Sequence, residues 1–460
     1  MKQLLTAIGI GTILLLSRCS KEDFLNTKPE DYLVIPETLE DFQALLDNDR
    51  WMNGITTGTG GPNPSMGEVG SDNLFFPDVN YVQVPISQQN VYTWQSNIYS
   101  PGSVYDWEVP YRVVFYSNVV LEGIGKMKYD PSKSEAYNNI KGAALFFRSS
   151  TFYQLAQVFA SRYEKDKAES SLGIPLRLQS DVNILSTRAT IKDTYDRIIS
   201  DLKASISLLP LVPVVKTRPS KPATYGLLSR VFLAMENYDE SLKYADSCLA
   251  INNSLMNYNE LPNTTYPIQR FNSEVIFASA LIGEPYHYIT LGRIDTILYK
   301  SYSEFDLRKS AFFRVIAADG YMRFRGSYNG SSVNFAGIAT DEIYLNKAEC
   351  LARMGSIDQA LDVLNRLLKQ RFTSEGFEPV VGTNANQVLG LILEERRKEL
   401  VMRGLRWTDL RRLNKDDQFA KTLTRVVNGI SYSLPPNDLK YTLPIPYEVV
   451  SMTGMIQNER

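Results

Sequence analysis

The chain has 460 residues, a hydrophobic content of 44% and a formal net charge of −2. Such a length can bury a large core, and the balance of apolar and charged residues is that of a soluble globular protein. A charge this close to zero argues against a nucleic-acid partner, which requires a basic surface. There are three cysteines without a CxxC spacing and a single histidine, His287. We therefore expect no metal site and no cofactor, and we expect Cys248 and Cys350, which lie among apolar helical positions, to be buried.

The amino terminus has the features of a bacterial signal peptide. Lys2 gives a positive start, and residues 4–16 are an apolar run that is too short to span a bilayer. The run ends at Cys19, and this junction resembles the lipobox of bacterial lipoproteins, in which the cysteine is acylated. Arg18 departs from the small residue that usually precedes the cysteine, and an ordinary signal peptide with an incidental cysteine is the alternative. We predict a lipoprotein signal peptide over residues 1–18 and lipidation at Cys19.

A short tract with the sequence SKED follows at residues 20–23. It resembles the surface-export signal of Bacteroidetes lipoproteins, although a solvated linker would have the same polar composition. Several acyl chains on one cysteine would anchor the protein stably. We expect a cell outer membrane protein that is lipid-anchored, faces the cell exterior, and forms a single domain over residues 19–460.

The body of the chain has the apolar period of helices. Two long segments each place their apolar residues on one face, and Pro210 is expected to end the second segment. These two faces consist of Ile140, Ala144, Phe147, Thr151, Leu155 and Val158, and of Ile191, Tyr195, Ile198, Ile199, Leu202, Ile206 and Leu209.

Two later segments, 225–250 and 344–368, resemble each other as helix–turn–helix pairs. Aligned on their turns, Met235 matches Met354, and Gly355 is expected to close the first helix of the second pair. Small residues where helices meet and a tight turn between them are typical of tetratricopeptide packing. The sequence therefore predicts a mainly α fold, in which tetratricopeptide-like helix pairs form a spine.

Two long stretches, about 51–105 and 254–335, are rich in Gly, Pro, Asn, Ser and aromatic residues. Loops of this length in a compact protein are usually functional. Because they alternate with helical segments, we interpret them as loop-rich insertions into one domain.

Several motifs along the mature chain resemble, in the same order, the SusD/RagB family of Bacteroidetes nutrient-uptake lipoproteins. They include KGAALFFR at 141–148, ATYGLLSRVFL at 223–233 and LPIP at 443–446. The most specific are ERRKEL at 395–400 and GLRWTDLRR at 404–412. The resemblance implies a SusD-like fold and a protein that binds a nutrient, often an oligosaccharide, and passes it to a SusC-like TonB-dependent barrel transporter.

By this resemblance the helical repeats face the barrel and the insertions hold the ligand. Aromatic rings can stack on the apolar faces of sugars, and polar side chains can match the hydroxyls. The candidate ligand-binding residues are Trp51, Asp72, Tyr81, Tyr92, Trp94, Asn97, Tyr99, Tyr286, Tyr288, Tyr321, Arg323 and Tyr328. For each aromatic residue, packing in the core or within a loop is the competing interpretation.

Three other functions stay open. The first is peptide capture by a relative of the same family, which a charged groove would favour over aromatic platforms. The second is a surface hydrolase, but the sequence has no GxSxG, HExxH or phosphate-binding GxxxxGK[ST] motif, and we expect no enzyme activity. The third is a structural assembly protein, which the helical repeats alone would permit.

Residues 395–412 contain many charged side chains, which could indicate a catalytic site. On a helix, however, Arg396 falls on the same face as Leu389 and Ile392 and points inward, where it needs a carboxylate partner. We therefore interpret the stretch as a structural ion network and assign Trp407 to the core.

Overall fold

The computed structural model describes residues 36–55, 61–283 and 288–460. Cys19, Tyr286 and His287, with the segment expected to be a signal peptide, lie outside this part of the chain. The described residues form eighteen α-helices and five two-stranded sheets, so the predicted mainly α fold class is confirmed.

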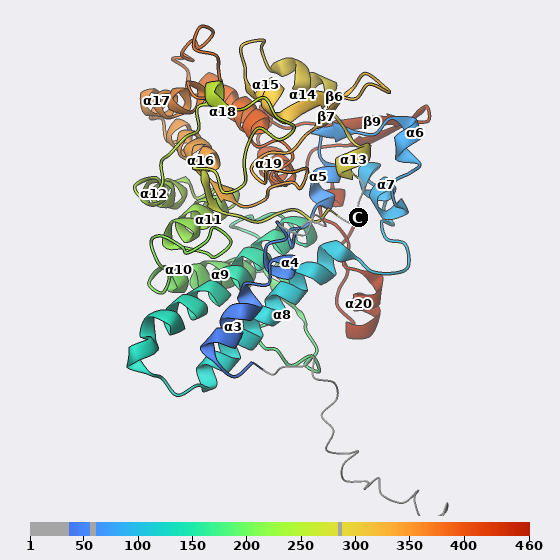
Figure 1. Cartoon of the computed structure of the whole chain (residues 1–460). Coiled ribbons are helices and arrows are strands. Elements are labelled where there is room, and N and C mark those ends of the chain that lie inside the picture. The colour runs from blue at the N-terminus through green and yellow to red at the C-terminus, as the bar shows by residue number, and fades with distance from the viewer. Residues whose placement is uncertain (1–35, 56–60, 284–287) are drawn as a thin grey trace, which may run out of the picture.

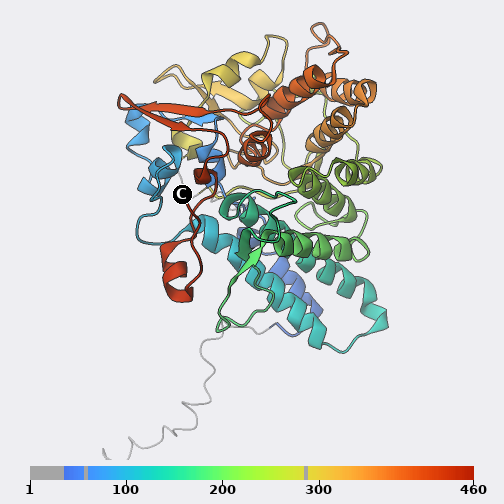
Figure 2. The ribbon, with the colours of Figure 1, turned by 180° about the vertical axis from the view of Figure 1, so that it is seen from behind.

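The spine consists of eight helices, which pack in chain order so that each contacts the next, and α18 also packs on α16. It runs along one side of the molecule, and the short helices between residues 66 and 92 and the hairpin of residues 423–434 lie on the other side (Figures 1 and 2). The spine helices are α8 (Tyr105–Lys126), α9 (Ser134–Phe159), α10 (Ile191–Ile206), α11 (Lys221–Ala234), α12 (Tyr238–Leu249), α16 (Thr340–Arg353), α17 (Ile357–Leu368) and α18 (Ala385–Glu399).

The other elements are shorter. The remaining α-helices are α3 (Leu39–Leu46), α4 (Asp49–Met52), α5 (Met66–Gly70), α6 (Asp78–Tyr81), α7 (Ile86–Tyr92), α13 (Tyr288–Leu291), α14 (Thr296–Ser301), α15 (Arg308–Phe312), α19 (Arg406–Leu413) and α20 (Tyr447–Thr453). The 3₁₀ helices are η1 (Pro131–Lys133), η2 (Tyr258–Glu260) and η3 (Leu439–Tyr441). The strands are β1 (Leu74–Phe75), β2 (Leu172–Pro175), β3 (Arg188–Thr190), β4 (Val275–Phe277), β5 (Arg293–Ile294), β6 (Phe313–Val315), β7 (Met322–Phe324), β8 (Ile338–Ala339), β9 (Leu423–Val427) and β10 (Ile430–Leu434).

The two predicted helix–turn–helix pairs are α11–α12 and α16–α17, and they lie side by side through α12 and α16. Gly355 ends the turn of the second pair with a φ of 82°, a left-handed conformation that glycine adopts without strain. The matching position of the first pair is Glu236, which adopts φ 60° despite its side chain. Ala245 and Ala348 are fully buried, so the small residues do allow the close approach of these helices.

The predicted apolar faces of α9 and α10 are buried, with Ile199 and Ile206 at the partly exposed edge. Helix α10 ends at Ile206, before the predicted end at Pro210, but Leu209 still packs in the core at 4% exposure. Cys248 and Cys350 are buried free thiols, as expected, and burial raises the pKa of the Cys350 thiol to about 12.

The two loop-rich insertions contain the short elements α4–α7 and α13–α15, and they fold against each other. Strand β1 of the first pairs antiparallel with β5 of the second, with Leu74 opposite Ile294. Asn63 and Leu281 form a further bridge, and the Asn80 side chain donates to the Leu291 carbonyl at 2.8 Å. Segments that are about two hundred residues apart in the chain therefore form one surface.

Among the described residues, none of the helices combines the length and apolar character needed to cross a bilayer.

Candidate functional site

The motif at 395–412 holds the insertions to the spine. Arg396 donates to Asp409 at 2.9 Å and to Asn346 at 2.7 Å, which confirms the predicted inward charge and its carboxylate partner. Trp407 is 2% exposed, as predicted, and its indole NH donates to the Tyr441 carbonyl at 3.1 Å. Its ring packs so closely on α5 that a Cβ on Gly70 would lie 3.0 Å from it.

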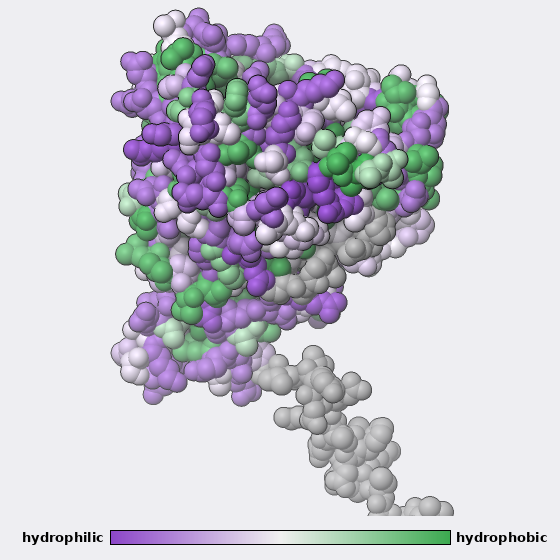
Figure 3. All heavy atoms as spheres, turned by 45° about the horizontal axis from the view of Figure 1, so that its top comes forward, coloured by the Kyte–Doolittle hydropathy of each residue, from purple (hydrophilic) through white to green (hydrophobic). Residues whose placement is uncertain are grey.

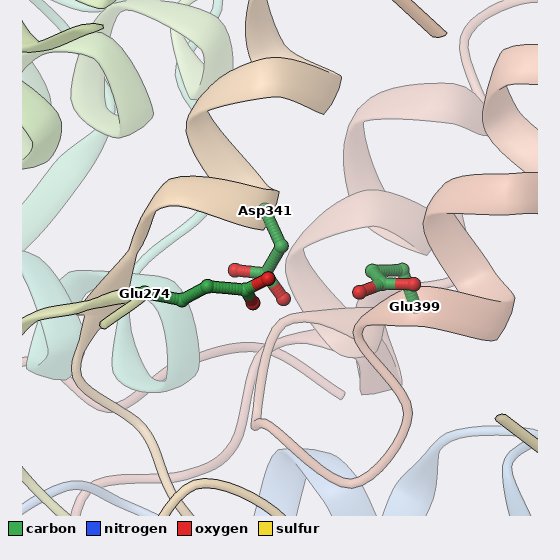
Figure 4. Close-up of side chains that lie close together, drawn as sticks. All are labelled: Glu274, Asp341 and Glu399. Atoms are coloured by element: carbon green, nitrogen blue, oxygen red, sulfur yellow. The ribbon is translucent and has the colours of Figure 1, made fainter. Parts of the chain in front are cut away.

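The same motif contributes to a buried cluster of three carboxylates, Glu274, Asp341 and Glu399 (Figure 4). Their oxygens lie within 4.8 Å of one another, a spacing that could hold a metal ion. Arginines already neutralise them: Arg371 binds Glu274 at 2.8 Å and Glu399 at 2.7 Å, and Arg403 binds Asp341 at 2.6 Å. The cluster is therefore a structural ion-pair network.

Four candidate aromatics lie in the core: Tyr92, Trp94, Tyr288 and Tyr328, each at most 2% exposed. Their polar ends are satisfied inside the protein. The Trp94 indole donates to the Gly70 carbonyl at 3.0 Å, and the Tyr328 hydroxyl lies between Glu274 and Asp341, 2.9 Å from the latter. In this structure these rings offer no open face to a ligand.

Asp72 was expected to be a polar partner of the ligand, but its oxygens are occupied by cations. Arg406 binds it at 2.7 Å, Lys421 at 2.8 Å and Arg397 at 3.3 Å. Burial alone would raise the pKa of this carboxyl, but Arg406 and Arg397 outweigh burial and hold it well below its usual range. Asp72 therefore anchors the first insertion to the motif helices.

Three further candidates of the first insertion, Trp51, Asn97 and Tyr99, lie away from its contact with the second insertion. Trp51 of α4 is half-buried, and the Arg112 guanidinium of α8 lies 4.0 Å from its ring centre. Asn97 accepts a hydrogen bond from the Tyr447 hydroxyl at 2.9 Å, and the Tyr99 hydroxyl donates to the Pro444 carbonyl at 2.8 Å. Asn97 and Tyr99 thus pack against the C-terminal segment around α20.

Two candidates remain accessible where the insertions meet, Tyr321 and Arg323, whereas the partly exposed Tyr81 lies against Tyr92 of α7, with 5.8 Å between ring centres. Tyr321 is 42% exposed and packs edge-on against Phe75 of β1, with 5.0 Å between ring centres. The nearby Arg293 donates to Asp319 at 2.7 Å, which fixes the turn before Tyr321. We call this surface the insertion junction and define it by Phe75, Tyr321 and Arg323, with the buried Arg293 supporting it from below.

The insertion junction has an apolar border. Val79, Val82 and Ile86 on α6 and α7 are each more than 60% exposed, and Val426 and Ile430 extend from the β9–β10 hairpin. Figure 3 shows hydrophobic residues gathered on the side where Figure 1 places α6 and β9. Sequence analysis missed Phe75 and Arg293, because the pairing of β1 with β5 that brings them to Tyr321 is not visible in either segment alone.

Two sequence profiles of one family match the chain. Residues 23–233 match the profile described as "Starch-binding associating with outer membrane", and residues 323–460 match the SusD family profile. Together they span more than half of the chain. The chain belongs to the SusD/RagB family.

Individual SusD relatives agree with this assignment. SusD-like protein P2 of Formosa agariphila is 22% identical, with 76% of this chain and 79% of the relative covered. A SusD superfamily crystal structure from Bacteroides thetaiotaomicron VPI-5482 has a TM-score of 0.74 at 23% identity, covering 92% of this chain and 100% of that one. A putative sugar binding protein from Bacteroides vulgatus ATCC 8482 has a TM-score of 0.73 at 23% identity, covering 92% and 99%. These structures establish a shared fold.

Proposed function

We propose that this SusD-family protein captures a carbohydrate at the insertion junction and delivers it to a SusC-like TonB-dependent barrel transporter. The observation that carries the proposal is the pairing of β1 with β5, which brings Phe75 against the exposed Tyr321 ring, on the same surface as the partly exposed Arg323. The family description as starch-binding and outer-membrane-associated supports the ligand class and the location. Acylated Cys19 would anchor the protein, as the resemblance to lipoprotein signals implies.

The chemistry of the insertion junction suits a glycan. Tyr321 packs edge-on against Phe75 and can present its ring to the apolar face of a sugar. Arg323 supplies several N–H donors for sugar oxygens. The surrounding ion-pair network holds the two insertions in place, so little ordering is required when the ligand binds.

Peptide capture stays the alternative, and one observation favours it. Arg314 and Arg323 lie directly opposite each other in the β6–β7 ladder, and Arg314 is exposed. Like charges in this register repel each other, and an anionic ligand would relieve the repulsion. Acidic peptides and acidic glycans both carry the negative charge that would relieve this repulsion, whereas a neutral glycan does not.

We propose binding without turnover. Hydrolysis needs a nucleophile with a base, or two positioned carboxylates that are free to act. In the described part of the chain, the carboxylate cluster of Glu274, Asp341 and Glu399 is buried and neutralised by arginines.

The first prediction tests the ligand site. Tyr321→Ala should weaken glycan binding by about 1–3 kcal/mol, or roughly 5- to 150-fold in Kd, because it removes the exposed stacking ring. Calorimetry against a panel of neutral and acidic oligosaccharides and acidic peptides measures the change. Tyr129→Ala is the matched control, because Tyr129 is 54% exposed and lies beyond the end of α8. Equal affinities of the two variants for a bound glycan would place the site elsewhere.

The second prediction tests the anchor. Cys19→Ala should move the protein from the membrane fraction to the soluble fraction, because the acceptor of the acyl chains is gone. Fractionation of cells labelled with a fatty-acid precursor measures both location and acylation. Cys248→Ala is the control, because that thiol is buried and should not be acylated. A Cys19→Ala protein that keeps the label would overturn the lipoprotein assignment.

A further inference from the structure

A cavity of about 260 Å³ lies away from the insertion junction. Its walls come from the segment after α9, from the end of α19, and from residues 437–442 around η3. None of these elements contributes a residue to the insertion junction. The side chains that matter for its chemistry are Arg162, Glu164, Arg411, Asn414 and Tyr441.

Arg411 places a buried positive charge in this wall. It is 4% exposed, and its guanidinium donates to the carbonyls of Gln157 and Ala160 at the end of α9. No carboxylate of the described chain forms an ion pair with it, in contrast to the neighbouring Arg412, which binds Glu349 and Asp409. Carbonyl dipoles satisfy its N–H groups but leave the net charge uncompensated.

Two further polar groups in the wall have no hydrogen-bond partner of ordinary geometry among the described residues, although their side chains lie close enough to interact with each other. Asn414 is 2% exposed, and its Oδ1 accepts from the Lys421 amide at 3.1 Å while its Nδ2 is unpartnered. The Tyr441 hydroxyl is also unpartnered, on a residue that is 4% exposed. Buried polar groups are normally satisfied, and an unsatisfied one costs about 1–3 kcal/mol. Both donors line the same cavity, so a single occupant could satisfy both.

The two acidic residues of the cavity, Glu164 and Asp438, are fewer than its three basic residues, Arg162, Lys167 and Arg411. Glu164 binds Arg162 at 3.2 Å and Lys167 at 2.9 Å, and Asp438 accepts from the Lys440 amide at 2.9 Å as the cap of η3. Arg162 is itself held by the Asn437 side chain. The cavity therefore combines a surplus of positive charge with unused hydrogen-bond donors.

We propose that this cavity binds a small oxyanion, namely a carboxylate or sulfate group, either free or carried by an acidic sugar. The oxyanion accepts hydrogen bonds from Asn414 Nδ2 and the Tyr441 hydroxyl and compensates the charge of Arg411. The cavity has room for about one monosaccharide unit. This site is independent of the carbohydrate site proposed at the insertion junction.

The test uses the mature protein with sodium sulfate, D-glucuronate and glucose as probes, at constant ionic strength set with sodium chloride. Sulfate or glucuronate should bind saturably in calorimetry, and glucose should not. Binding of glucuronate but not sulfate would identify a sugar acid as the ligand, and binding of sulfate alone would identify a free oxyanion. Saturable binding of neither anion overturns the proposal.

Two variants locate the binding. Tyr441→Phe removes only the hydroxyl and should weaken anion binding about tenfold. Asn414→Asp keeps the acceptor for the Lys421 amide but replaces the unpartnered donor with an anionic oxygen, so anion binding should be lost. Tyr129→Phe, which changes an exposed hydroxyl elsewhere, is the control. Melting without anion establishes that each variant is folded, and unchanged anion affinity in folded Tyr441→Phe and Asn414→Asp proteins overturns the assignment of the cavity.

Discussion

Replacing Glu399 with glutamine is expected to lower the free energy of unfolding by roughly 3–5 kcal/mol, because it breaks a buried ion network from its centre. Glu399 accepts from Arg371 at 2.7 Å and from Arg308 at 3.1 Å, and the side chains of all three residues are 0% exposed. The substitution keeps the shape of the side chain but leaves two buried guanidinium groups without this negative charge. Denaturant titration near pH 7 measures the loss.

Glu240→Gln provides the matched control, because Glu240 also pairs with a cation, Lys243, at 2.8 Å but lies on the surface. Exposed pairs contribute at most about 1 kcal/mol, so this variant should remain close to the parent protein. Arg308 belongs to α15 of the second insertion, and Glu399 ends α18 of the spine. Glu399→Gln should therefore also make residues 254–335 more susceptible to limited proteolysis. A loss below 1 kcal/mol with unchanged proteolysis would show that this network does not fasten the insertion.

The helical spine could be predicted from sequence because its signals are local. Each helix needs only its own apolar period, and the turn at Gly355 needs only a residue that tolerates a positive φ. Arg396 and Trp407 could also be placed, since a charge on an apolar helix face has few alternatives to a buried partner.

The sequence could not show which of the candidate ligand-binding residues are exposed and which are buried. Trp94 and Tyr321 both lie in loop-rich segments with similar composition, yet Trp94 is 2% exposed and Tyr321 is 42% exposed. Trp94 is covered because its indole reaches the Gly70 carbonyl, and Tyr321 is accessible because it stands at the edge of the β1–β5 pair. These contacts join segments distant in the chain, and no local pattern encodes them. Asp72 is similar, because its partners Arg397 and Arg406 lie more than three hundred residues away.

Glu68 gives the fold a pH dependence near neutrality. It is 1% exposed and accepts from the Asn73 side chain at 2.8 Å and from the Gly404 amide at 2.9 Å, so it joins the first insertion to the motif at 404–412. Burial raises the pKa of this carboxyl from 4.5 to about 7, against the lowering effect of both hydrogen bonds. The folded protein therefore binds a proton more tightly than the unfolded chain does.

The protein should consequently become more stable as the pH falls from about 7.5 to 5, by roughly 2 kcal/mol from Glu68 alone. This contribution is fully present below the unfolded pKa and is lost as the pH rises through the folded one. Burial also raises the pKa of Glu274, so this residue adds to the same trend. Glu349 behaves differently: burial would raise its pKa, but Arg412 outweighs burial and lowers the pKa to about 2, so its protonation reduces stability only in stronger acid.

Glu68→Gln tests this assignment through the slope of stability against pH, measured by denaturant titration from pH 5 to 7.5. The variant should be less stable than the parent protein at low pH. Each Glu68 oxygen accepts one N–H donor, but the amide nitrogen of glutamine cannot accept, so one of these two donors loses its partner. It should also lose most of the rise in stability on acidification, and what remains should come from Glu274. His287 is present in both proteins, so its titration cancels in the comparison. A parent protein that is equally stable at pH 5 and 7.5, or a variant with the parent's slope, would show that Glu68 is ionised throughout this range.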